Sequence, residues 1–246
     1  VGSEMCIRDS RFITGLVKTE EFESKFKKYL EMGLDILYIA CSSKLSGSVG
    51  NGKVVAEELM EKYPGRKIIC LDSLRSTYGE GQIAIAAAKM ANEGMELEEA
   101  AKKIEEEKLK YQIFCTVGSL EWLKKAGRVK ASAAFFGNLF GVKPIIIADA
   151  KGNNYAYKKV KGRKTALDDI IASVKERIID PENATVYVEH ADCLKDAEYV
   201  INSLKEQVNP KNIVLGNVGP IIGATTGPDT IVVSFYGEKV TIVGEE

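Results

Sequence analysis

The residues best suited to chemistry in this sequence are the hydroxyl and glycine residues that follow one apolar segment. Ile36–Cys41 has the length and composition of a β-strand, and Ser42-Ser43-Lys44-Leu45-Ser46-Gly47-Ser48 follows it directly. Ligands usually dock at the carboxyl ends of strands in an open α/β sheet, and N–H groups near a helix start attract anions. The loop is therefore a candidate site for a small oxygen-bearing anion, with the candidate ligands Ser42, Ser43, Ser46 and Gly47. The alternative is that these hydroxyls only cap the next helix.

The same segment allows a different chemistry, in which Ser46 or Cys41 is the nucleophile of a hydrolase or transferase for small acyl or phosphate esters. Such a nucleophile needs a base within hydrogen-bond reach. His190 is the only histidine; it follows a distant predicted strand and precedes Ala191-Asp192-Cys193, which is typical of a helix-capping turn. Hydroxyls without nearby bases favour binding over turnover. The leading hypothesis is a binding protein with no catalytic residue, cofactor or metal, and an enzyme is the alternative.

Two further segments bear on a ligand site. Gly223-Ala224-Thr225-Thr226-Gly227-Pro228-Asp229 is a second loop of small residues that leads into a strand, which makes a shared ligand site more credible. Ala131–Leu139 is apolar almost throughout, and it is expected to form domain core or to line a pocket between domains. Its neighbourhood contains Phe135, Phe136 and Phe140.

Two other motifs have structural interpretations. Lys124–Arg128 combines basic residues with glycine, as helix C-termini do. Gly79–Ala84 matches the dinucleotide pattern G-x-G-x-x-A, but no acidic residue ends a strand about 20 residues later. A helix start is therefore the favoured interpretation of Gly79–Ala84.

The composition is typical of a soluble globular protein. The chain has 246 residues, of which 45% are hydrophobic and 28% charged, and a formal net charge of -1. Lys and Arg are scattered, so there is no electrostatic case for nucleic acid as a partner, and no apolar run approaches the roughly 18 residues that span a membrane. The five cysteines are widely spaced without a CxxC pair, which indicates reduced thiols in a cytoplasmic protein.

The elements that must position the serine loop alternate between helix and strand. Apolar residues at helical spacing or in strand-length runs predict helix 20–32, strand 36–41, helix 54–63, strand 67–71, helix 82–92, helix 97–108 and strand 111–116. This alternation is typical of a Rossmann-like parallel sheet with helices on both faces. We expect 111–116 to be the third strand of that sheet.

The pattern changes after Gly137. Strands are predicted over 143–149 and 154–161, around the turn-rich Lys151–Asn154. They are followed by helix 164–179, strand 185–189, helix 194–207, strand 212–217 and a hairpin of 230–236 with 239–243. Hairpins mixed with two helices indicate a smaller C-terminal α+β domain.

The start of the chain is treated separately. Met5-Cys6-Ile7-Arg8-Asp9-Ser10 resembles a translated sequencing adapter, so we take 1–10 as a non-native tail and expect a front portion of the native protein to be missing. The expected organisation is an N-terminal α/β domain over 11–138, incomplete at its start, and a C-terminal α+β domain over 139–246. A missing strand predicts lower stability and a partly open sheet or pocket.

Taken in order, these segments resemble the DegV family of bacterial fatty-acid-binding proteins, from about Val17 to Val243. The family's Ser-x-x-Leu-Ser-Gly-Thr loop is similar to Ser42–Ser48, and its Asp-Ser strand end to Asp72-Ser73. Its Lys-Gly-Gly-Arg, Lys-Pro-Ile and Gly-Pro motifs match Lys125–Arg128, Lys143–Ile145 and Gly227-Pro228. Each motif is short, but five of them in the family's order make the resemblance specific.

The resemblance implies a long-chain fatty acid buried between an N-terminal α/β domain and a smaller C-terminal α+β domain. The carboxylate would be held by the serine loop and by Thr19, from an early Thr-Ser motif in which Glu20 replaces the Ser. Thr225 and Thr226 occupy the place where the family often has His, and Lys161 and Arg163 the place where it often has Arg. These four residues are the expected neighbours of the head group. The acyl-chain pocket would be lined by Phe135, Phe136 and Phe140.

The resemblance also implies a partner. Family members present the bound fatty acid to a separate fatty acid kinase, which makes an acyl-phosphate, so the binding protein needs no catalytic base of its own. A third hypothesis is a structural or regulatory protein whose cleft is filled by its own side chains.

Overall fold

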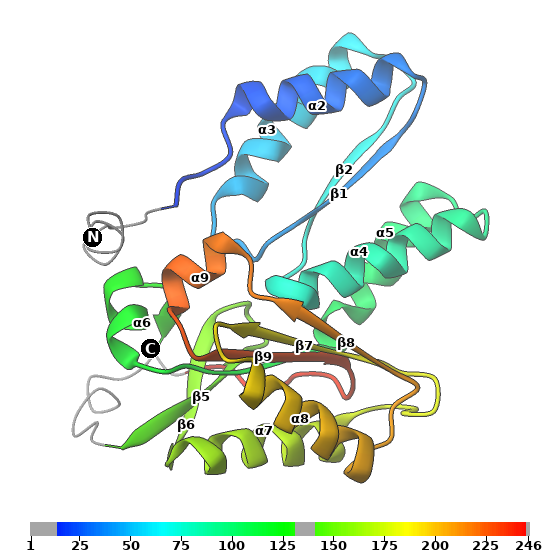
Figure 1. Ribbon diagram of the computed structural model, residues 1–246. Helices are drawn as coiled ribbons and strands as arrows, with labels where there is room; N and C mark the ends of the chain where they lie inside the picture. The colour runs from blue at the N-terminus through cyan, green and yellow to red at the C-terminus, as the bar shows by residue number, and fades with distance from the viewer. Residues whose placement is uncertain (1–13, 131–140, 245–246) are drawn as a thin grey trace, which may run out of the picture.

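The computed structural model describes residues 14–130 and 141–244. The chain first forms a unit of helices around a pair of strands, which lies above a larger sheet (Figure 1). The elements of this first unit are α2 (Thr19–Glu31), β1 (Ile36–Ala40), α3 (Ser48–Lys62), β2 (Ile68–Asp72), α4 (Thr77–Asn92) and α5 (Leu97–Glu107).

Strands β1 and β2 form a parallel pair whose two faces are covered by different helices. Tyr38 of β1 packs with Phe22 of α2, whereas Leu37 and Ile39 pack with Ile83 of α4. Successive side chains of a strand point to opposite faces, so an unbroken apolar run suits a strand that is covered on both sides. The expected α/β fold, with a parallel sheet and helices on both faces, is confirmed.

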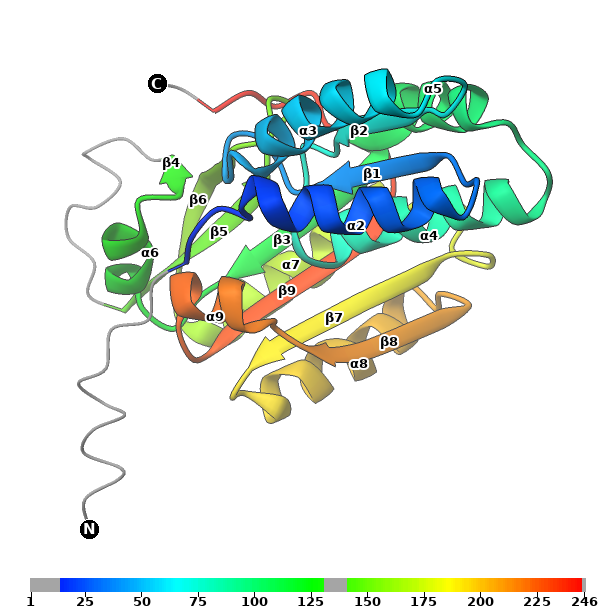
Figure 2. The same ribbon diagram turned by 90° about the horizontal axis from the view of Figure 1, so that it is seen from above.

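The rest of the chain builds a seven-stranded mixed sheet in the order β4-β6-β5-β3-β9-β7-β8. After a short 3₁₀ turn, η1 (Lys108–Lys110), its elements are β3 (Tyr111–Thr116), α6 (Leu120–Ala126), β4 (Val129–Lys130), β5 (Val142–Ala148), β6 (Asn154–Lys161), α7 (Arg163–Arg177), β7 (Thr185–Ala191), α8 (Leu194–Gln207), β8 (Asn212–Asn217), α9 (Pro220–Thr226) and β9 (Thr230–Tyr236). In the view from above, α2 and β1 lie over the strands of this sheet (Figure 2).

One strand lies in a different sheet from the one expected. We predicted 111–116 as the third strand of the parallel sheet, but β3 lies between β5 and β9 and is antiparallel to both. All six of its residues are buried. A strand that is buried on both faces is stable wherever both faces are covered, and its sequence pattern does not specify its pairing partner. Within the described residues the β1–β2 sheet therefore has two strands, and β3 leads the chain into the second sheet.

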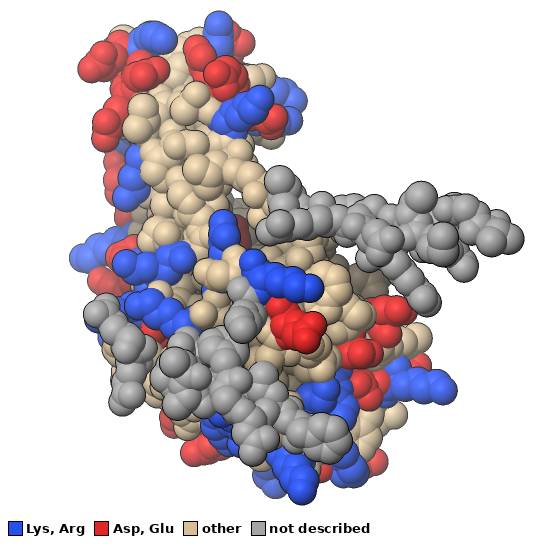
Figure 3. Space-filling view, turned by 90° about the vertical axis from the view of Figure 1, so that its left-hand side faces the viewer, with Lys and Arg blue, Asp and Glu red and all other residues tan. Residues whose placement is uncertain are grey.

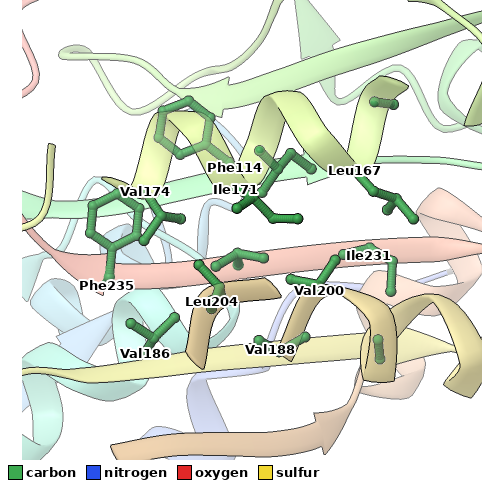
Figure 4. Packing of buried hydrophobic residues seen from close by; sticks show 14 of the residues in the cluster. Phe114, Leu167, Ile171, Val174, Val186, Val188, Val200, Leu204, Ile231 and Phe235 are labelled. Carbon is green, nitrogen blue, oxygen red and sulfur yellow. The ribbon is translucent and has the colours of Figure 1, made fainter. Parts of the chain in front are cut away.

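The largest core lies between the seven-stranded sheet and the helices α7 and α8 (Figure 4). Ile171 of α7 and Leu204 of α8 point toward Val188 of β7 and Phe235 of β9, and each of these side chains is at most 2% exposed. Full burial of one such side chain contributes about 1.5–3 kcal/mol. The first unit lies on the opposite face of the sheet (Figure 1).

The remaining predicted elements are present, although α3 and α4 begin at Ser48 and Thr77, before the predicted starts at 54 and 82. Two other segments differ from the prediction. The segment 239–243, expected as a strand, has no strand conformation. Thr225 and Thr226, expected in a loop, lie in helix α9, which begins with Pro220, a residue whose fixed φ favours a helix start. The predicted cap after Lys124 is confirmed, since α6 ends at Ala126 and Gly127 is left-handed with φ 64.

The predicted domain boundary between residues 138 and 139 falls in the segment 131–140, outside the described residues. The division into domains over 11–138 and 139–246 therefore stays a prediction.

Candidate ligand-binding site

Ser42 joins the two sheets of the molecule. Its hydroxyl donates to the carbonyl oxygen of Gly152, in the turn between β5 and β6, at 2.7 Å, and accepts from the N–H of Lys44 at 3.2 Å. Its N–H donates to the carbonyl oxygen of Arg75 at 2.8 Å, and the side chain is fully buried. Because a hydroxyl has one hydrogen to donate, Ser42 shapes the loop in this arrangement and its O–H is already used.

The turn opposite Ser42 is held by a buried carboxylate. Asp149 accepts from the N–H groups of Lys151, Asn153 and Gly244 at 2.8–3.0 Å. Burial opposes the ionisation of Asp149, but hydrogen bonds from Asn153, Gly244 and Lys151 outweigh it and lower the carboxyl pKa below its usual value. The turn thus presents the Gly152 carbonyl to Ser42 from a fixed backbone.

Arg75, in the loop after β2, links the first unit to η1, to the start of β3 and to the turn after β5. Its side chain is fully buried, and its guanidinium donates to the carbonyl oxygens of Leu74, Leu109, Tyr111 and Asp149. Burial lowers the guanidinium pKa to about 10, so the group stays charged at neutral pH. Sequence reasoning missed Arg75, because nothing in a single arginine after a strand indicates that it is buried.

The other predicted carboxylate ligands lie on neighbouring segments. Ser46 donates its hydroxyl to that of Ser48 at 3.0 Å, and the Ser48 hydroxyl accepts from the N–H of Val17 at 3.4 Å. Val17 lies two residues before Thr19, which begins α2. The structure therefore brings the chain before Thr19 alongside the start of α3, where Ser46 and Gly47 lie.

Two predicted donors are accessible. Ser43 and Thr19 are exposed, and within the described residues neither hydroxyl has a hydrogen-bond partner. The backbone N–H of Ser43 donates to Asp72 at 3.2 Å, so the position of the residue is defined while its hydroxyl is available.

A half-buried acid, Glu80, lies close to the end of β1. Burial raises the pKa of Glu80, in the first turn of α4, to about 7. Burial, followed by the nearby Glu80 charge, raises the pKa of the Cys41 thiol to about 12. A thiol attacks as its thiolate, so Cys41 is a poor nucleophile at neutral pH.

A second acid, Glu189 of β7, joins the large sheet to α4. It is 4% exposed, and its carboxylate accepts from the N–H of Tyr78, in the first turn of α4, at 3.4 Å. Burial raises its pKa to about 7. Sequence reasoning did not find this residue, because one acid in a strand gives no signal of its burial.

Among the described residues, no hydrogen bond or ion pair joins the predicted head-group neighbours to the serine loop. Lys161 is exposed at the end of β6. Arg163 begins α7 and donates to Asp196 of α8 at 2.8 Å, on the face of the large sheet opposite to the first unit (Figure 1). The hydroxyls of Thr225 and Thr226 donate to helical carbonyl oxygens of α9, at 3.2 and 3.0 Å.

Two other predictions concern the pocket and the base. Phe135, Phe136 and Phe140 lie outside the described residues, so the acyl-chain pocket stays a prediction. His190 lies in β7, and its Nδ1 accepts from the N–H of Cys193, the residue before α8, at 3.3 Å. This geometry is that of the predicted capping turn. In the described part of the chain, no hydrogen bond joins His190 to Ser46 or Cys41.

The surface near the loop carries positive charge. Lys44 and Lys151, exposed residues, flank the two segments that the Ser42–Gly152 bond joins. On the face seen in Figure 3, Lys and Arg side chains gather between the upper unit and the large sheet. No described helix is long and apolar enough to cross a membrane, and residues 14–130 and 141–244 contain no cluster of three or more His, Cys, Asp or Glu that could hold a metal.

The fold defines the class: this is a two-unit α/β protein. A parallel α/β unit packs over a larger mixed sheet, and a hydroxyl-rich loop lies at the junction of the two. The chain belongs to the DegV family: the family model described as "Uncharacterised protein, DegV family" matches residues 8–238. A DegV domain-containing protein of Clostridium perfringens is 35% identical over 225 residues, which cover 92% of this chain and 77% of that protein.

Solved structures of the family have the same fold. A fatty acid binding DegV family protein from Thermus thermophilus matches with a TM-score of 0.85 at 23% identity, over 96% of this chain and 82% of that one. The fatty acid binding DegV family protein SAG1342 from Streptococcus agalactiae matches with a TM-score of 0.84 at 22% identity, over 96% and 83%. A DegV family protein from Eubacterium eligens, loaded with heptadecanoic acid, has a TM-score of 0.82 at 18% identity, over 95% and 83%.

Proposed function

We propose that this protein binds a long-chain fatty acid between its two units and presents the carboxylate to a fatty acid kinase, which makes an acyl-phosphate. The observation that carries the proposal is the serine loop itself, a set of hydroxyls and N–H groups fixed at the junction by the Ser42–Gly152 bond. The fatty acid binding described for proteins of the same fold supports it.

In this proposal Ser43, Gly47 and Thr19 receive the carboxylate, and Ser46 does so by turning its hydroxyl from Ser48 to the ligand. Ser42 holds the loop in shape. Hydrogen bonds from hydroxyl and N–H donors to a carboxylate are strong without a buried counter-ion. Burial of each methylene contributes about 0.8 kcal/mol, so a long acyl chain supplies on the order of 10 kcal/mol before ordering costs. The exposed Lys44 and Lys151 would favour an anionic head group at the surface.

The proposed location is the cytoplasm, where such a kinase would find its ATP. The thiols of Cys41, Cys70, Cys115 and Cys193 are unpaired, as is usual in a reducing compartment.

The test is mass spectrometry of organic extracts from the purified protein. A stoichiometric fatty acid is expected, with lower occupancy in Ser43→Ala and Thr19→Val. Thr165→Val changes an exposed threonine of α7 and should retain the ligand. Added kinase and ATP should then yield an acyl-phosphate that hydroxylamine traps. An empty wild-type protein, or equal occupancy in all variants, would contradict the proposal.

The esterase alternative has less support, because Ser46 is bonded to Ser48 and the Cys41 pKa is about 12. Turnover of a chromogenic ester that is lost in Ser46→Ala would favour it.

A further inference from the structure

A groove of about 510 Å³ lies at the junction of the two units, away from the serine loop. Its walls come from α4, α5, the connection between α7 and β7, and the strands β3, β7 and β9. The residues 42–48 do not line it. Its volume lies within the roughly 300–1,000 Å³ of small-molecule sites.

The groove has an aromatic floor. Tyr111, Tyr187 and Tyr236 line it, and the rings of Tyr111 and Tyr236 meet edge to face with centroids 5.2 Å apart. Ile85 of α4 and Ile179 also line it, and they are 44% and 42% exposed, so both side chains offer apolar surface to a molecule in the groove. A flat apolar molecule would cover these surfaces.

One polar group in the groove lacks a partner. Gln82 of α4 is 8% exposed, lines the groove, and has its amide Nε2 buried with no hydrogen-bond partner. A buried donor that is left unpaired destabilises the fold. If the Gln82 amide turned toward the groove, an acceptor on a molecule bound there would satisfy this donor.

The charges at the rim are nearly balanced. Two lysines face three acids, one of which, Glu107, is paired with Lys110 at 3.3 Å. The charged lining residues are Lys89, Lys103, Glu93, Glu107 and Asp180. This arrangement does not select a strongly charged ligand.

We infer that this groove is a second ligand site, for a neutral planar aromatic or heteroaromatic molecule whose carbonyl or ring nitrogen accepts a hydrogen bond from Gln82. The ring would stack on the tyrosine floor, between Ile85 and Ile179. The site does not depend on the proposed fatty acid binding.

The inference is tested by saturation-transfer NMR with nicotinamide as the probe. Signal is expected with the wild type and about tenfold weaker binding with Gln82→Leu, which removes the donor at similar volume. Ile85→Trp should fill the groove and abolish the signal. Ala88→Trp is the matched control, because Ala88 is exposed on α4 and does not line the groove. Cyclohexanecarboxamide, which has the acceptor without the flat ring, should bind more weakly than nicotinamide.

The outcomes separate this site from the fatty acid site. If palmitate binds, nicotinamide signal that persists with saturating palmitate supports a second site. If palmitate does not bind, loss of the signal in Ile85→Trp with retention in Ala88→Trp supports the groove as the site. Displacement by palmitate, no signal with the wild type, or equal signal in all three variants would overturn the inference. Thermal unfolding of each variant shows whether a lost signal comes from misfolding. If both variants are folded, Ile85→Trp and Gln82→Leu must both weaken nicotinamide binding.

Discussion

The hydroxyl oxygen of Ser42 lies 2.7 Å from the carbonyl oxygen of Gly152, a residue 110 positions later in the chain. This bond joins the loop after β1 to the turn between β5 and β6. The loop that we propose as a carboxylate site is therefore shaped by the second sheet. A substitution in the turn should lower both the fatty acid occupancy and the stability of the protein.

Gly152→Ala should destabilise the protein more than a glycine substitution with the same backbone geometry. Gly152 has φ +85, and a Cβ there would lie 2.4 Å from the Ser42 hydroxyl oxygen. Gly65 has φ +87 but open space around it, so Gly65→Ala isolates the conformational cost of about 1–2 kcal/mol. Gly152→Ala should cost roughly 1–3 kcal/mol more, because it also breaks a buried hydrogen bond. Urea unfolding measures the stability of both variants. Equal losses of stability in Gly152→Ala and Gly65→Ala would show that the Ser42 contact has no energetic role.

Arg75→Met should be strongly destabilising, by about 3–5 kcal/mol, because it leaves buried carbonyl groups without a donor. Arg66→Met is the control: Arg66 donates to Gly33 at the surface and lies 3.6 Å from Asp35, and exposed pairs contribute only about 0–1 kcal/mol. The free energy of unfolding in denaturant gives the comparison. A small loss of stability in Arg75→Met would mean that water replaces the hydrogen bonds of the guanidinium.

Glu189→Gln should change how stability depends on pH. The folded protein raises the Glu189 pKa from 4.5 to about 7, so the folded state holds a proton that the unfolded state releases between these values. Wild-type stability should thus fall as pH rises from 4.5 through 7, by about 2–3 kcal/mol from this group. Gln cannot ionise and still accepts from Tyr78, so the variant should lack this loss.

The control for Glu189 is Glu182→Gln, an exposed residue in the connection before β7. Its unfolding free energy should follow the wild type across the range. If Glu189→Gln also follows the wild type, Glu189 is ionised in the fold and the inferred burial effect is wrong.

The four cysteines within the described residues should react slowly in the folded protein. Burial raises the thiol pKa of Cys41 and Cys115 to about 12, and that of Cys70 and Cys193 to about 11. Alkylation by iodoacetamide at about pH 7.5 should therefore be at least about a hundredfold slower than in the urea-unfolded chain. Peptide mass spectrometry resolves each site, and rapid alkylation of Cys41 would renew the case for a nucleophile.

Several features followed from local sequence alone. The apolar run of Ile36–Ala40 and the change to hydroxyls at Ser42 located a strand and its carboxyl-end loop, because strand length and breaking residues are local properties. Gly127 marked the end of α6 for the same reason. The motifs around Ser42–Ser48 and Gly227-Pro228 were sufficient to indicate the family, which the match over residues 8–238 confirmed.

Other features were decided only by the tertiary structure. Local periodicity does not encode the pairing partner of a strand, so it could not show that β3 leaves the parallel sheet for β5 and β9. The burial of Arg75 and Glu189, and the use of the Ser42 hydroxyl by Gly152, depend on segments distant in sequence. Residue type and spacing determined which groups could bind an anion, whereas packing between the two units determined which of them are free to do so.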